Sequence, residues 1–154
     1  PTEAEANEYA QKLSDMIKVP TISLRGNTDL SQFYKLHEVM KQSFPLIFEK
    51  LECTEIEGNL LFRWPGKASN APSVMMAHFD VVPVVEEMWE KPPFAGILED
   101  GVIWGRGTLD TKGTLCGVME ALEAMLGEER VGRLALCMEN GVIIAVQGSL
   151  LLLP

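Results

Sequence analysis

Two helical patterns of apolar residues open the chain. Apolar side chains recur at helical spacing over residues 1–18, and Thr2 with Glu5 forms a capping-box pattern at the start of this segment. A second helix is predicted from Leu30 to Phe44, with Asp29 as its cap. The chain is therefore expected to begin with two helices before any strand.

Short runs with strand character follow the helices. Residues 51–57 and 60–64 flank Gly58-Asn59, which is a two-residue hairpin signal. The uninterrupted apolar run Val74–Ala77 is typical of a strand that is buried on both faces. A second hairpin is predicted over Ile97–Trp104, around an Asp-Gly pair.

A third helical pattern runs from about Thr114 to Leu126. Two further strand signals, Leu134–Met138 and Val142–Val146, flank Asn140-Gly141 and predict a third hairpin. Helices and strands that follow one another in this way indicate an α/β fold.

The composition excludes some classes of function. The 154 residues are 47% hydrophobic and 23% charged, which is typical of one globular domain. The net charge of −9 argues against binding to nucleic acid or to anionic membranes. No signal peptide or membrane-spanning segment is visible, so a cytoplasmic location is predicted. An odd number of cysteines without regular spacing indicates reduced thiols rather than disulfides: Cys53, Cys116 and Cys137.

Candidate chemistry is concentrated where the run Val74–Ala77 ends. His78 and Asp80 are two residues apart, so on a strand they would point to the same side. Imidazole is a common ligand for zinc, and a ligating histidine usually donates its other N–H to a carboxylate, a role that suits Asp80. Asp110 adds a carboxylate from a second strand–loop–helix junction. A lone His-x-Asp is more often a polar pair at a loop mouth, and His37, on a helix without a ligand partner, is interpreted as structural.

The stretch from Ser73 to Gly113 resembles the N-terminal signature of the M20 family of metallopeptidases. Within that family it is most similar to the branch of carboxypeptidase S and N-acyl-amino-acid hydrolases. The resemblance covers residues 1–127, whereas 128–154 diverge and the separate lid domain is absent. It implies a three-layer, mixed-sheet zinc-peptidase catalytic domain that is incomplete at its C-terminus, so residues 1–154 are expected to form a partial catalytic domain. The matching pieces are His78-Phe79-Asp80-Val81-Val82-Pro83, Trp89, Pro92-Pro93-Phe94, Asp100-Gly101 and Gly105-Arg106-Gly107-Thr108-Leu109-Asp110-Thr111-Lys112-Gly113.

The same resemblance implies roles for individual residues. His78 would bind one metal ion, Asp80 would orient His78, and Asp110 would bridge two ions, usually zinc, with cobalt or manganese as possible substitutes. The peptide bond after Asp110 would be cis. Glu128-Glu129 loosely resembles the family's adjacent glutamates, with Glu128 as general base and Glu129 as a metal ligand. Because this pair follows the predicted helix directly, without an intervening strand, we interpret it as exposed helix-end charges and keep the catalytic pair as the alternative.

The expected function is metal-dependent hydrolysis of amide bonds in peptides or N-acyl amino acids. No histidine follows His78 to supply a later ligand, so the isolated chain is expected to bind zinc weakly and to be inactive. The alternative is a non-catalytic fragment that binds a partner, or a second copy of itself, through an unfinished sheet edge.

Overall fold

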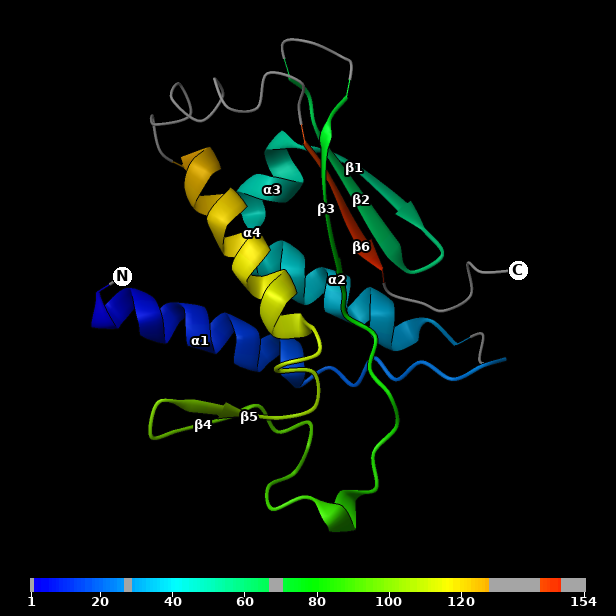
Figure 1. Cartoon of the computed structure of the whole chain (residues 1–154), viewed down its shortest axis with the longest axis vertical. Coiled ribbons are helices and arrows are strands. Elements are labelled where there is room, and N and C mark those ends of the chain that lie inside the picture. The colour runs from blue at the N-terminus through cyan, green and yellow to red at the C-terminus, as the bar shows by residue number, and fades with distance from the viewer. Residues whose placement is uncertain (1, 27–28, 67–70, 128–141, 148–154) are drawn as a thin grey trace.

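The computed structural model of the chain describes residues 2–26, 29–66, 71–127 and 142–147. The helices are α1 (Glu3–Ile17), α2 (Ser31–Ser43), α3 (Pro45–Lys50) and α4 (Lys112–Gly127), with a short 3-10 turn, η1 (Glu86–Met88). The strands are β1 (Glu52–Ile56), β2 (Asn59–Trp64), β3 (Ser73–His78), β4 (Ile97–Glu99), β5 (Val102–Trp104) and β6 (Val142–Gln147). Figure 1 shows the main sheet beside α2, α3 and α4, with the β4–β5 hairpin apart from it, near α1.

The main sheet is mixed and has the strand order β1-β2-β6-β3. Strand β6 lies between β2 and β3, although it comes last among the described elements (Figure 1). It runs antiparallel to β2, with Leu60 opposite Val146, and parallel to β3, with His78 opposite Gln147. The predicted α/β fold with a mixed sheet is therefore confirmed, and so is the strand predicted at 142–146.

One face of the sheet packs against the helices to form the core. Alternate residues of β2 and β6 point to this face, and five of them are almost completely buried. The Phe48 ring of α3 meets the Phe62 ring edge-on, with the ring centres 5.0 Å apart. Burial of each such side chain stabilises the fold by about 1.5–3 kcal/mol. The strand residues in this set are Leu60, Phe62, Val142, Ile144 and Val146.

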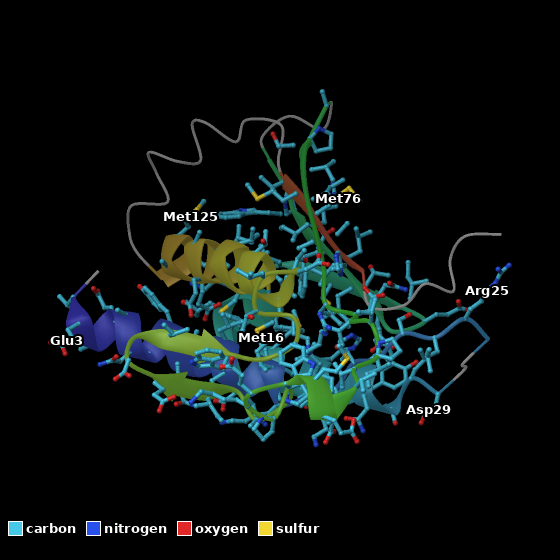
Figure 2. The ribbon with its side chains drawn as sticks, turned by 60° about the horizontal axis from the view of Figure 1, so that its bottom comes forward. Glu3, Met16, Arg25, Asp29, Met76 and Met125 are labelled. Carbon is cyan, nitrogen blue, oxygen red and sulfur yellow. The ribbon has the colours of Figure 1, made fainter. Side chains whose placement is uncertain are left out.

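The opposite face of the sheet is open in the described part of the chain. Leu61, Val74 and Met76 have exposed fractions of 36%, 58% and 73%. Met76 projects from β3 on the side away from α4 (Figure 2). The strand at 74–77 is therefore confirmed, but the prediction that it is buried on both faces is wrong. Among the described strands β3 pairs only with β6, and Met75, which points to the other face, is also 38% exposed.

The helix ends follow the predicted signals, with one change of detail. Thr2 Oγ1 accepts the Glu5 N–H, and the Glu5 carboxylate accepts the Thr2 N–H, which confirms the capping box. At α2, Leu30 occupies the cap position, but Asp29 Oδ1 still accepts the backbone N–H of Ser31 at 2.9 Å. None of the helices in the described ranges is long and apolar enough to cross a membrane.

Two of the predicted hairpins are present, one with a shifted turn. The β1–β2 turn uses Glu57 and Gly58, with φ of 47° and 79°, rather than Gly58-Asn59. Positive φ at both central residues is what a tight two-residue hairpin turn requires. The β4–β5 turn uses Asp100-Gly101 as predicted. The strand predicted at 134–138 lies outside the described residues.

The thiol of Cys116 in α4 gives the fold a testable pH dependence. Burial, with a smaller contribution from Glu120, raises the pKa of Cys116 from 9.0 to about 12. Because the pKa is higher in the folded state, the neutral thiol of Cys116 contributes to the free energy of unfolding. This contribution is complete below about pH 9 and is lost as the pH rises towards 12, at about 1.4 kcal/mol per pH unit. We therefore expect urea unfolding near pH 10 to show a stability loss that the Cys116→Ala variant lacks. Equal losses in both proteins would contradict this.

Candidate metal centre

The segment after β3 is braced by the loop that follows α1. The backbone N–H of Val81 donates to Thr21 O at 2.9 Å, and the backbone N–H of Ser23 donates to Val81 O at 2.9 Å. The Thr21 hydroxyl also donates to Phe79 O, and the Phe79 side chain is fully buried. Asp80 is thus flanked on both sides by residues whose backbone is anchored. This brace was not predicted from the sequence, because it joins segments that lie far apart along the chain.

His78 and Asp80 meet as predicted, although Asp80 lies two residues beyond the end of β3. The Nδ1 atom of His78 is 3.1 Å from Asp80 Oδ1 and 3.2 Å from the backbone oxygen of Asp80. Because both neighbours of Nδ1 are acceptors, the hydrogen-bond network places a proton on Nδ1. Burial raises the pKa of Asp80, and His78 and Ser23 offset part of that rise. The ring is thus oriented by a largely buried carboxylate.

Asp110 reaches the other side of the same ring. Its Oδ1 atom is 3.2 Å from His78 Nε2, and its side chain is 82% exposed. Asp110 lies two residues before the first residue of α4, near the helix end where the dipole favours a negative charge. The peptide bond between Asp110 and Thr111 is cis, as expected. The structure therefore brings together the three residues His78, Asp80 and Asp110 that the sequence singled out.

A buried lysine fixes the start of α4. Lys112 is fully buried, and its Nζ donates to Met16 O at 3.0 Å and to Val19 O at 2.7 Å, at the end of α1. Met16 itself lies between α1 and α4 (Figure 2). Burial lowers the pKa of Lys112 to about 7. From the sequence, Lys112 had no predicted role beyond its place in the matched motif, because its contacts with Met16 and Val19 lie far away along the chain.

The chemistry of this group fits part of a site for zinc or a similar ion. An imidazole nitrogen and a carboxylate oxygen face each other across 3.2 Å, and both atom types bind zinc. A catalytic zinc site needs about three protein ligands and a water. Within the described ranges no set of three or more His, Cys, Asp and Glu side chains forms a metal-binding group. Glu128 and Glu129 lie outside the described residues.

Known proteins of the M20 peptidase family are similar to this chain. Residues 74–140 match the profile of peptidase family M20/M25/M40. The chain is 37% identical over 128 residues to the N-fatty-acyl-amino acid synthase/hydrolase of Homo sapiens, covering 80% of this chain and 26% of the relative. It is 35% identical over 134 residues to carboxypeptidase S of Saccharomyces cerevisiae, covering 78% of this chain and 23% of the relative. Residues 74–140 therefore carry part of a domain of the M20 peptidase family.

Solved structures of M20 proteins share the fold of this chain. An M20 family metallo-carboxypeptidase from Sulfolobus solfataricus matches 91% of the chain with a TM-score of 0.69 and 23% identity. Human carnosine dipeptidase 1 matches 95% with a TM-score of 0.68 and 16% identity. The chain spans 30% and 32% of these two structures and about a quarter of the curated relatives.

Proposed function

We propose that this chain supplies the metal-binding N-terminal part of an M20 amide-bond hydrolase. The observation that carries the proposal is the placement of His78 between two carboxylates, with Asp80 at Nδ1 and Asp110 at Nε2. This is the arrangement of a metal-ligating histidine whose second nitrogen is held by a carboxylate. The match of residues 74–140 to the M20 family profile supports the use of a divalent metal.

Each of the three residues has a distinct task in this proposal. His78 Nε2 and the Asp110 carboxylate would hold the ion, and Asp110 would face a second ion if two are bound. Asp80 is a positioning residue, because it contacts the ring at the nitrogen that faces away from Asp110. A divalent ion bound there would polarise a carbonyl group and acidify a water molecule.

The proposed substrates are peptides with a free C-terminal carboxylate or N-acyl amino acids. The names of two relatives support these classes, since one is a carboxypeptidase and the other acts on N-fatty-acyl amino acids. Both classes contain an amide bond next to a carboxylate. Glu128 as general base and Glu129 as a further ligand remain predictions, because both lie outside the described residues.

Calorimetric titration with zinc tests the proposed site directly. The chain is expected to bind zinc weakly, because two ligands hold the ion less firmly than the three or so of a catalytic site. His78→Ala should remove this binding, whereas His37→Ala should not, because His37 is buried against Phe79 and Gly58. Zinc binding that is unchanged in His78→Ala would rule out the site.

The activity assay uses the same chain with a panel of N-acyl amino acids and peptides. We expect no metal-dependent release of amino acids from the chain alone. Tight binding of two zinc ions together with turnover, both lost in Glu129→Ala, would instead make Glu128-Glu129 the catalytic pair.

A second candidate function is a partner-binding module without catalysis. The open sheet face and the outer edge of β3 favour it, since Val74 and Met76 are exposed on a strand that carries no charged residue. Light scattering during size-exclusion chromatography would detect self-association through this edge. A monomer at high concentration, with no change in Met76→Lys, would argue against it.

A further inference from the structure

A single hydroxyl group joins the end of β3 to the loop that carries Asp110. Thr111 Oγ1 donates to the backbone oxygen of His78 at 2.8 Å and accepts the backbone N–H of His78 at 3.3 Å. A threonine hydroxyl has one donor and two lone pairs, so it can make both bonds at once. Thr111 thus contacts the same residue through both of that residue's main-chain polar groups.

This pair of bonds replaces strand pairing at one residue of β3. The N–H and C=O of a strand residue point to the same side, so one partner can satisfy both. No described strand pairs with the outer edge of β3, since β6 lies along its other edge. At His78 the Thr111 hydroxyl makes the hydrogen bonds that a neighbouring strand would make. The backbone of His78 is therefore fixed although it lies on a sheet edge.

The same contact fixes the distance between the two candidate metal ligands. Thr111 is joined to Asp110 by the peptide bond, and its hydroxyl is hydrogen-bonded to the backbone of His78. Thr111 therefore links the two candidate ligands. The Asp110 side chain is 82% exposed, and packing of that side chain alone cannot hold it 3.2 Å from His78 Nε2. The backbone constraint through Thr111 adds to the direct contact with His78 Nε2 in setting this separation.

We propose that Thr111 is a positioning residue for the metal centre, acting through the backbone of His78. The hydroxyl is the part of the side chain that matters, because both contacts are made by Oγ1. Outer partners of metal ligands typically contribute about 10–100-fold to metal affinity. The effect on metal binding rests on the proposed function, whereas the effect on the geometry of His78 does not.

Three threonine variants separate the hydroxyl from the rest of the side chain. Thr111→Val keeps the shape and removes the hydroxyl, whereas Thr111→Ser keeps the hydroxyl. Thr108→Val is the matched control, because the Thr108 hydroxyl donates to Gly105 O at 2.8 Å within the same loop but contacts neither ligand. Each protein is titrated with zinc and with cobalt, and the visible spectrum of bound cobalt reports the ligand geometry.

We expect Thr111→Val to weaken metal binding about 10-fold and to alter the cobalt spectrum. Thr111→Ser should restore both, and Thr108→Val should behave like the parent chain at equal thermal stability. Unchanged affinity and spectrum in Thr111→Val would overturn the proposal. Equal weakening in Thr108→Val would overturn it too, because the effect would then belong to the loop in general.

NMR of the imidazole nitrogens in the metal-free chain keeps this test independent of the proposed function. The chain has two histidines, so His37→Ala and His78→Ala assign both rings. Thr111→Val should shift the His78 signals and leave those of His37 in place. If no variant binds metal, the proposed function fails while the NMR result still decides the role of Thr111. Unshifted His78 signals would contradict that role.

Discussion

Replacing Gly113 by alanine is expected to destabilise the fold by about 3 kcal/mol, near the upper end of the usual cost of overpacking. A methyl group at this position of α4 would lie 2.2 Å from the backbone oxygen of Thr108. The obstacle is main chain, which cannot rotate away as a side chain does. The helix and the loop before it must then separate, and that loop carries Asp110. Thermal unfolding should show a midpoint lowered by about 6–12 °C, at 2–4 °C per kcal/mol.

Gly117 provides the matched control on the same helix. A methyl group there would meet no atom within 4 Å, and the residue is exposed. Gly117→Ala should stabilise the chain by about 0.5–1 kcal/mol, because alanine loses less backbone freedom than glycine in a helix. Equal midpoints for Gly113→Ala and the parent chain would show that α4 can move away from Thr108 at little cost.

Asp80→Ala is expected to weaken zinc binding by about 10–100-fold, which is the usual effect of removing the carboxylate behind a ligating histidine. The change removes the acceptor 3.1 Å from His78 Nδ1, so the proton is no longer kept on the nitrogen that faces away from Asp110. The measurement is a zinc titration of this chain, with NMR of the His78 ring nitrogens to follow the tautomer.

Two further variants define how Asp80 acts. Asp80→Asn retains an oxygen acceptor but not the charge, and an intermediate loss is expected. Glu52→Ala removes a carboxylate that pairs with Arg63 on the exposed surface of the sheet, and it should leave zinc affinity unchanged. An Asp80→Ala chain with the affinity of the parent would show that Asp80 is only part of the loop.

Local signals in the sequence were sufficient for most elements of the fold. The capping box at Thr2, the apolar period of α4 and the Asp-Gly turn of β4–β5 each depend on a few neighbouring residues, and all three are confirmed. The contact between His78 and Asp80 was also local, because the two residues are close in sequence. Asp110 was singled out by its place at a second strand–loop–helix junction, and its role as a metal ligand was implied by the family resemblance.

The features that the sequence could not predict depend on distant partners. Thr111 lies far along the chain from His78, and nothing in its local pattern indicates which backbone groups it will bind. An apolar run such as Val74–Ala77 indicates a strand, but its burial depends on which elements cover each face. The Glu57-Gly58 turn was misplaced by one residue because Asn59 is equally suited to a turn and instead begins β2.

The central position of β6 determines the order in which the strands of the sheet can pair during synthesis of the chain. The β1–β2 hairpin joins neighbours in sequence and can form early, whereas β3 has no described pairing partner until residues 142–147 have left the ribosome. Until then an apolar strand would have both edges free, which is the state in which nascent chains mispair or require a chaperone. A chain interrupted before Val142 would still contain His78, Asp80 and Asp110, but the strand that ends at His78 would lack the neighbour that holds it in the sheet.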